Sequence, residues 1–455
     1  MEIEQSSLYR EIKSILNSPS KPVHYHWKAE IHVGDKTYKP LKLLSIDFKE
    51  DFENNYAAEV LVEMALSGGQ YAKRIYPFQD NIDITLFRNP IQEYSDVANQ
   101  EAVVETERYT ATIIDRGNPL IEGNGANSAS ERDLDLTNIF NITFQLVNKS
   151  LEQLRMISVG GIYRDTDVET VLKGVLASES KKVQVENVRA LKGVDMVPAS
   201  NVTKRDHILI PQGTKLVDMP EYIHRKCGGV YSSGMGYYQQ GDYWYIYPCY
   251  DTTRFNNSTH TLTVINVPEN KFPQVERTYR QDGDSLTIIA TGEVKFADDS
   301  DVMQLNFGNG IRFADANNFM DGFTVTKDNK TVANRPGTNS EFISEARPNG
   351  NNNVQMSVNA INANSMVEFS KMARRQGCVL SLVWENSLPH LIYPGMMVKM
   401  MYLEGEDIKT IYGVALKAHH YVQTKGQGMT DARHVCRSML AVFVKSPKAT
   451  DVPPT

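Results

Sequence analysis

The sequence predicts a mainly β fold that carries a smaller α+β insert. Segments of alternating apolar and polar residues, separated by Gly, Pro, Asn and Asp, recur in residues 23–165 and again after residue 261. A period of two is typical of strands that bury one face. Between these regions, residues 166–260 mix helical spacing with short strands. With 455 residues, 41% of them apolar, the chain is long enough for about three domains with cores of their own.

Residues 1–22 predict a short helix followed by a linker. An apolar stripe runs through residues 6–17 at helical spacing, and Ser6 or Ser7 stands where a cap is needed. The segment 17–22 contains two prolines, which end the helix. The stripe consists of Leu8, Ile12, Ile15 and Leu16.

Residues 23–165 are predicted to form a first β-barrel region with a long hairpin. About five strands fit into residues 23–90, and the segment 81–88 alternates most clearly. The β pattern continues beyond it, through a polar, Gly-rich loop at 122–130 and a long strand at 134–147. So many short strands in so few residues favour a small barrel or sandwich.

Residues 166–260 are predicted to be an inserted α+β module. The sequence Thr166-Asp-Val-Glu169 is typical of a capping box, in which the Thr and Glu side chains each accept a backbone N–H of the other residue. A helix should therefore follow it, and a second, short helix is expected at 219–225, where Pro stands early. Residues 228–249 are rich in Gly and Tyr, and they predict short strands with a hairpin turn at 240–242.

A run of aromatic residues in this module lies at strand spacing. Tyr243, Tyr245 and Tyr247 should share one face of a strand, with Trp244 and Ile246 on the other face. Two interpretations fit this run. We favour rings that pack inside a small sheet, and the alternative is a platform for a carbohydrate or a nucleobase.

Residues 261–360 predict further strands around a polar insertion at 296–350, and residues 361–455 predict a helix and C-terminal barrel strands. Asn, Gly, Pro and Thr dominate 328–360, which predicts a long surface loop. A second capping box, Ser365-Met-Val-Glu368, predicts a helix that ends at Gly377.

Composition and missing motifs exclude several classes of function. The net charge is −7, from 48 Lys and Arg against 55 Asp and Glu, without the basic stripe of a nucleic-acid-binding protein. The chain has no Walker A loop, GxSxG, HExxH or GxGxxG. It shows neither a secretory signal at its N-terminus nor an apolar run long enough for a membrane helix. We expect no enzymatic activity, no cofactor and no direct contact with nucleic acid or membrane.

One group of residues is a candidate metal site. His434 and Cys436 share a face of a strand, and a tetrahedral zinc site needs two more ligands from a neighbouring strand. His419 and His420 are the nearest candidates, but only one of them can face the same way, because neighbours on a strand point to opposite faces. We therefore interpret all four as strand residues near a barrel end and expect no metal. The four cysteines are widely spaced, which predicts free thiols.

The order of these segments resembles the central hub of contractile-tail bacteriophage baseplates, which is related to the hub part of type VI secretion spike proteins. Residues 46–87, which end in the strand Ile82-Asp-Ile-Thr-Leu-Phe-Arg88, look like the tube-protein-type β-barrel that such hubs carry twice. The sequence Gly161-Ile-Tyr-Arg-Asp-Thr-Asp-Val-Glu-Thr-Val-Leu172 resembles the strand that leaves the second barrel and enters the helix of an inserted domain. Residues 210–248 are similar to the family's helix-then-strands module, which ends on a Tyr-Pro turn. Residues 392–421 are similar to its Pro-Gly turn followed by a Gly-initiated strand and a His-containing one.

The resemblance implies a fold of two tube-protein-like β-barrels, a smaller α+β domain and a C-terminal segment of helix and barrel strands. It also implies a structural virion protein of the tail baseplate, assembled in the host cytoplasm. Three chains with two barrels each form a ring of pseudo-six-fold symmetry, which lets a homotrimer join a six-fold tail tube to a three-fold central spike. The expected partners are the tail-tube protein, the central spike protein and other baseplate subunits.

Contacts with these partners are expected in loops 68–77 and 122–132, because these loops join strands at a barrel end. The expected interface residues are Gly68, Gly69, Gln70, Tyr71, Lys73, Arg74, Tyr76, Gly123 and Asn124.

Two other classes of function remain open. One is another tail-tip or adaptor protein of the virion, which uses similar β-rich interfaces with a different symmetry. The other is a tail enzyme that degrades cell wall or glycan, with the tyrosine run as its platform and an acidic residue as its catalyst.

Overall fold

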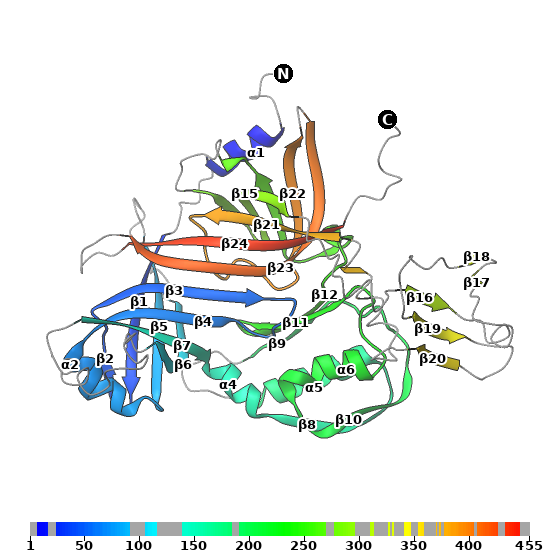
Figure 1. Cartoon of the computed structure of the whole chain (residues 1–455), viewed down its shortest axis with the longest axis horizontal. Helices are drawn as coiled ribbons and strands as arrows, with labels where there is room; N and C mark the ends of the chain where they lie inside the picture. The colour runs from blue at the N-terminus through cyan, green and yellow to red at the C-terminus, as the bar shows by residue number, and fades with distance from the viewer. Residues whose placement is uncertain are drawn as a thin grey trace, which may run out of the picture.

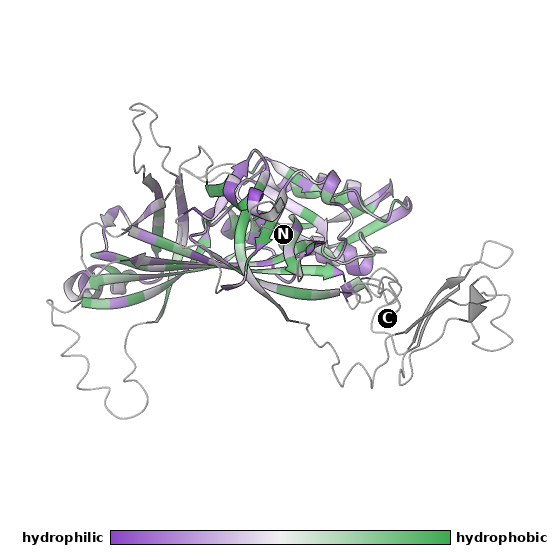
Figure 2. Cartoon of the chain, turned by 90° about the horizontal axis from the view of Figure 1, so that it is seen from above, coloured by the Kyte–Doolittle hydropathy of each residue, from purple (hydrophilic) through white to green (hydrophobic). Residues whose placement is uncertain are grey.

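The chain folds into two barrel-like units of six strands each, of which, among the described residues, only the second is closed by strand pairing, and an α+β insert (Figure 1). Most described residues form strands, so the predicted mainly β fold with a smaller α+β part is confirmed. Hydrophobic and hydrophilic segments alternate along many of these strands (Figure 2). The computed structural model describes residues 7–16, 24–91, 105–115, 139–183, 191–269, 277–295, 310–313, 326–327, 330–331, 341–346, 354–358, 370, 373–374, 377–404, 407–425 and 433–445.

The first unit, which we call barrel 1, contains six strands paired in the order β1-β5-β6-β7-β4-β3, all antiparallel. Alternate residues of these strands meet in one core, as the period of two predicts. A short strand, β2, pairs with the end of β1. The strands are β1 (His24–Val33), β2 (Lys36–Tyr38), β3 (Lys42–Asp51), β4 (Glu59–Ser67), β5 (Ile82–Ile91), β6 (Glu105–Asp115) and β7 (Ile139–Asn148).

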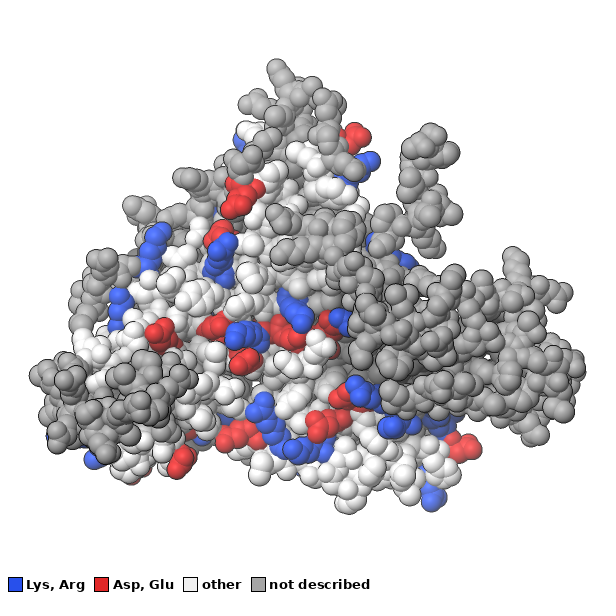
Figure 3. Space-filling view, viewed as in Figure 1, with Lys and Arg blue, Asp and Glu red and all other residues white. Residues whose placement is uncertain are grey.

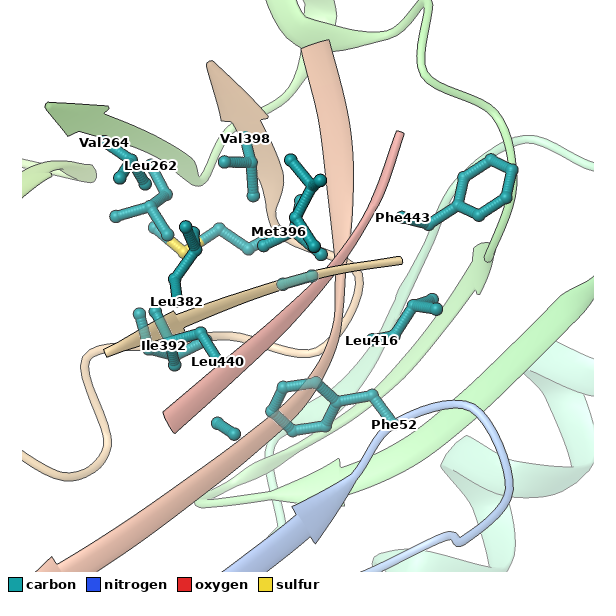
Figure 4. Close-up of a cluster of buried hydrophobic side chains, with 14 of the residues drawn as sticks. Phe52, Leu262, Val264, Leu382, Ile392, Met396, Val398, Leu416, Leu440 and Phe443 are labelled. Atoms are coloured by element: carbon teal, nitrogen blue, oxygen red, sulfur yellow. The ribbon is translucent and has the colours of Figure 1, made fainter. Parts of the chain in front are cut away.

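The second unit, barrel 2, closes on itself. Its six strands pair in the order β23-β22-β13-β15-β21-β24, and β24 pairs back with β23. Side chains from several strands, among them Leu262, Leu382 and Leu440, converge in its core (Figure 4). The strands are β13 (Thr261–Asn266), β14 (Tyr279–Asp282, paired with β15), β15 (Ser285–Lys295), β21 (Gly377–Glu385), β22 (Met397–Glu404), β23 (Asp407–Lys425) and β24 (Arg433–Lys445).

Two long strands connect the barrels. Strand β23 has 19 residues and β24 has 13. The first part of β23 pairs with β22, whereas its residues 417–423 pair with β3 of barrel 1. Accordingly, Ala415 lies in the core of barrel 2, while Val422 and Cys436 lie in the core of barrel 1. One continuous sheet therefore runs through both barrels (Figure 1).

The insert follows β7 and has its own core, built from helices and strands. Its strands form a two-stranded sheet, β10-β8, and a three-stranded sheet, β11-β12-β9. Its elements are α4 (Lys149–Met156), β8 (Ser158–Thr166), α5 (Val168–Ser180), β9 (Gly193–Met196), β10 (Arg205–Lys215), η5 (Leu216–Asp218), α6 (Met219–Lys226), β11 (Met235–Gln240), β12 (Tyr243–Pro248) and η6 (Phe255–Asn257).

The helix predicted after residue 166 is confirmed, but the predicted capping box is wrong. Asp167 caps α5, and its carboxylate accepts the N–H of Thr170 at 2.8 Å. Thr166 is instead the last residue of β8 and pairs with Arg205. Because the sheet holds Thr166 in a strand, the cap moves one residue along the chain.

Strand β12 lies between two cores, and the predicted alternation of its aromatic residues is confirmed. Tyr245 and Tyr247 pack into the core of barrel 2, whereas Trp244 and Ile246 pack into the core of the insert. All four are buried, and the hairpin predicted at 240–242 joins β11 to β12. Tyr243, at the start of the strand, is 37% exposed, but the other rings of the run are packed between two layers, which agrees with the packing interpretation rather than with an open platform.

The remaining predictions have mixed outcomes. Helix α1 (Ser7–Leu16) is confirmed, and its Ile15 packs on the outside of barrel 2. The surface loop predicted at 328–360 is wrong in part, because the alternating sequences at 341–346 and 354–358 form strands. The predicted box at 365–368 lies outside the described residues, and Gly377 begins β21. The strands of this region are β16 (Gly310–Phe313), β17 (Thr326–Lys327), β18 (Lys330–Thr331), β19 (Glu341–Ala346) and β20 (Val354–Val358).

Candidate functional site

The candidate functional site is the junction where both barrels and the insert meet. At the surface of the junction, Lys417 on β23 contacts Asp51 on β3 at 2.7 Å. Burial alone would raise the pKa of Asp51, but hydrogen bonds from Lys417 and Asn54 outweigh burial and lower that pKa. His419 on β23 also contacts Asp47 on β3. These pairs align β23 with β3.

A chain of buried polar side chains lies inside the junction. Glu50 on β3 is 2% exposed, and its Oε2 lies 3.3 Å from Nε2 of His420, which is fully buried on β23. The other ring nitrogen of His420 contacts the hydroxyl of Ser438 on β24 at 2.5 Å. Ser438 in turn donates to Ser387 at 2.6 Å. From the insert, Gln240 donates to Oε1 of Glu50 at 3.3 Å.

This chain of contacts links barrel 1, barrel 2 and the insert through one carboxylate. The contact between Glu50 and His420 is close, but it is not a well-formed hydrogen bond. A charged group buried this deeply is expensive unless it has partners. The arrangement is therefore stable only while all three units keep their relative positions.

Sequence reasoning missed these residues, although a signal exists. Glu50 follows Ile46 and Phe48 at strand spacing, so it occupies a position that should be apolar. His420 likewise lies between Ala418 and Val422 on the buried face of β23. A polar residue on the apolar face of a strand needs a partner, but the pattern alone does not identify that partner.

The four residues of the candidate metal site each contact other groups of the protein, and His420 and Cys436 both contact Ser438. Nδ1 of His434 accepts the backbone N–H of Trp27 at 3.3 Å, and burial lowers the pKa of His434 to about 4. Cys436 contacts Ser387 at 3.2 Å, and burial raises its pKa to about 12. His419 and His420 contact the carboxylates described above. Within the described ranges, no three His, Cys, Asp or Glu residues form a group that could hold a metal ion.

The predicted contact segment 68–77 forms a run of short helical turns between β4 and β5. The turns are α2 (Gly68–Gln70), η2 (Tyr71–Ile75) and η3 (Tyr76–Phe78). Ile75 anchors the run because it is fully buried in barrel 1.

Around this anchor, the segment presents basic and aromatic side chains. Lys73 and Arg74 are exposed, and Tyr76 and Phe78 are 38% and 55% exposed. Gln70 donates to the carbonyl of Lys39 at 2.9 Å, which holds the first turn against barrel 1. Gly123 and Asn124 lie outside the described residues, so their predicted role stays a prediction.

Charged residues of both signs are interspersed on the face drawn in Figure 3. A mixed surface of this kind differs from the basic face that binds the phosphates of nucleic acids. In the part of the chain that the structure describes, no helix combines the length and apolarity needed to cross a membrane.

Comparison with known proteins gives likenesses of fold and none of sequence. No protein-family model and no curated protein matches the chain. The fold is similar to that of a 43 kDa tail protein of prophage MuSo2 from Shewanella oneidensis, with 10% identity, 92% of this chain and 96% of that chain covered, and a TM-score of 0.43. It is also similar to a chain of the Francisella PdpA-VgrG complex, with 10% identity, 99% and 63% covered, and a TM-score of 0.38.

A third similar structure is an E. coli component of the type VI secretion system, described as structurally similar to the T4 bacteriophage tail proteins gp27 and gp5. Its identity is 9%, 93% of this chain and 79% of that chain are covered, and the TM-score is 0.34. With identities this low, the function proposed below depends on the barrels of this chain.

Proposed function

We propose that the chain is a structural protein of a contractile-tail baseplate, a trimeric hub that joins the six-fold tail tube to the three-fold central spike. The observation that carries this proposal is the presence of two six-stranded barrel units in one chain, held in one continuous sheet by β23. Three such chains present six barrels in a ring, which matches a six-fold partner on one side and a three-fold partner on the other.

The buried junction supports this role because it holds the two barrels at one relative orientation. A ring closes only if each chain repeats the same angle between its barrels. The contacts of Glu50 with His420 and Gln240 cross all three units and restrict their movement. A structural role in the tail needs no cofactor and no catalytic residue, because it depends on contacts between subunits.

In this proposal, the tail-tube protein contacts the basic and aromatic segment 68–76 at the end of barrel 1. The spike protein and other baseplate subunits complete the set of partners, and the assembled protein belongs to the virion.

Negative-stain electron microscopy of the purified chain, alone and with the spike protein of the same tail, tests the proposal. We expect ring-shaped particles with three-fold symmetry. A chain that stays monomeric with the spike added contradicts the hub, and particles of another symmetry favour a tail-tip or adaptor protein instead.

The tube contact is tested separately with charge-reversing variants. Lys73→Glu combined with Arg74→Glu should weaken binding of the tube protein while rings still form. The matched control changes two exposed lysines of the insert, Lys181→Glu and Lys204→Glu, and alters the net charge equally. Equal loss of binding in both pairs indicates a general charge effect rather than a contact at this segment.

A further inference from the structure

The two-stranded sheet of the insert has two outer edges, and no described strand pairs with either of them. Strand β8 pairs with β10 and, among the described residues, with no other strand. The two strands are long for an isolated pair, at nine and eleven residues. Two strands alone are marginal in water, and a third strand or a packed layer stabilises them.

The outer face of this sheet carries a pair of exposed apolar side chains. Ile162 and Leu209 lie directly opposite each other in the register, and they are 58% and 55% exposed. Their neighbours Ile208 and Ile210 face the core of the insert and are 1% exposed. The sheet is therefore fully packed on its inner face only.

The two edges of the sheet differ in how well they are protected. Strand β10 carries Pro211 within an irregularity of the register between Ile210 and Thr214. Proline and bulges are devices that prevent an edge from pairing with another strand. Strand β8 has neither proline nor charge in residues 158–163, so its edge is suited to pairing.

A groove of about 790 Å³ lies beside β8, with α5 on its far side. The helix lines it with small residues spaced by four, namely Thr170, Gly174 and Ser178. A Cβ added to Gly174 would meet nothing within 4 Å, so the groove is open at its middle.

We propose that this groove binds one extended segment of a partner polypeptide, which adds to β8 as a third strand. Backbone hydrogen bonds to β8 supply the affinity, and an apolar side chain of the segment covers Ile162, the member of the exposed apolar pair that lies on β8. Three charged side chains line the groove. Lys182 and Glu179 pair with each other at 2.6 Å, so Arg164 supplies the uncompensated positive charge. The segment therefore carries an acidic residue near one end. This site lies in the insert and does not depend on the trimer.

The test uses the full chain and synthetic probe peptides of nine residues, the length of β8. The first probe alternates valine and threonine, with glutamate near one end. Two further probes carry N-methyl groups on alternate backbone nitrogens, one probe in each of the two possible registers. Only one edge of the probe faces β8. Methylation of the nitrogens on that edge should weaken binding by about tenfold, and methylation of the nitrogens on the other edge should weaken it by less than about twofold.

A matched pair of variants locates the site. Ile162→Thr should weaken binding of the unmethylated probe by about fivefold, because it removes apolar contact area while keeping a strand-forming side chain. Ile139→Thr, which changes an isoleucine that is 50% exposed on β7, should leave binding unchanged. Circular dichroism checks that both variants fold.

Three results overturn the proposal. They are an absence of saturable binding of the first probe, equal effects of the two methylation registers, and equal effects of the two variants. Replacing glutamate by lysine in the probe should weaken binding, and a probe that binds more tightly with lysine contradicts the proposed charge of the partner segment.

Discussion

Replacing Glu50 by Leu should loosen the whole molecule, because this carboxylate connects three units. The change keeps the side chain close in size, so it creates little cavity. It removes one of the two acceptors of Gln240, which also donates to the carbonyl of Ile392, and it replaces the carboxyl oxygen 3.3 Å from Nε2 of the fully buried His420 with an apolar group. The lost hydrogen bond is worth about 1 kcal/mol and the lost polar contact of the buried imidazole up to about 2 kcal/mol, so the free energy of unfolding should fall by about 1–3 kcal/mol.

The tryptophans make the measurement specific to each unit. The chain has three of them, and Trp27, Trp244 and Trp384 lie in the cores of barrel 1, the insert and barrel 2. Urea unfolding followed by fluorescence of variants that each retain one tryptophan should show all three transitions shifted by Glu50→Leu.

The control is Glu59→Leu, which changes an exposed residue on the neighbouring strand β4 and should shift stability by less than about 0.5 kcal/mol. A double variant, Glu50→Leu with His420→Leu, should recover part of the loss, because it also removes the buried imidazole that the single variant leaves beside an apolar group. If Glu50→Leu is as stable as the control, or if only barrel 1 responds, the reasoning about the junction is wrong.

Three further predictions concern single contacts, each measured by chemical denaturation. Asp167→Ala removes the cap of α5 and should cost about 1 kcal/mol. The hydrogen bond from the backbone lowers the folded pKa of Asp167, so its contribution is complete above the unfolded pKa near 3.8 and is lost as pH falls through the folded value. The two proteins should therefore converge in acid, and a constant difference contradicts the cap. Tyr247→Phe removes a buried hydroxyl that donates to the carbonyl of Phe52 at 2.7 Å, and should cost about 1–2 kcal/mol; an unchanged midpoint means that the bond contributes nothing. Gly395→Ala places a Cβ 2.2 Å from the ring of Tyr247 at a φ of +68°, so it should cost more than Gly241→Ala, where φ is +57° and the space is open.

Local patterns in the sequence predicted many of the strands and the faces that they bury. The alternation along β12 predicted two faces, and both are buried, one in each core. The stripe on α1 predicted a helix, and its Ile15 is fully buried. Periodicity works here because the direction of a side chain depends on the backbone of its own segment.

The sequence was less informative where neighbouring structure competes with a local signal. Thr166 has the spacing of a helix cap, but pairing with Arg205 keeps it in β8 and leaves the cap to Asp167. The segment 328–360 has the composition of a loop, yet part of it pairs as strands. In both cases hydrogen bonds to distant residues outweigh the weak preference of the local sequence.

Only the tertiary structure decided how the barrels join and which polar residues hold the junction. Strand β23 reads as one strand in the sequence, but its two parts pair with strands of different barrels, and Lys417 contacts Asp51 across 366 positions of the chain. The sequence determined that Glu50 and His420 sit on apolar faces, where a polar group is costly without a partner. The proximity of Glu50 and His420 is a property of the fold. Periodicity indicates which way a side chain points, but it does not indicate which strand lies beside it.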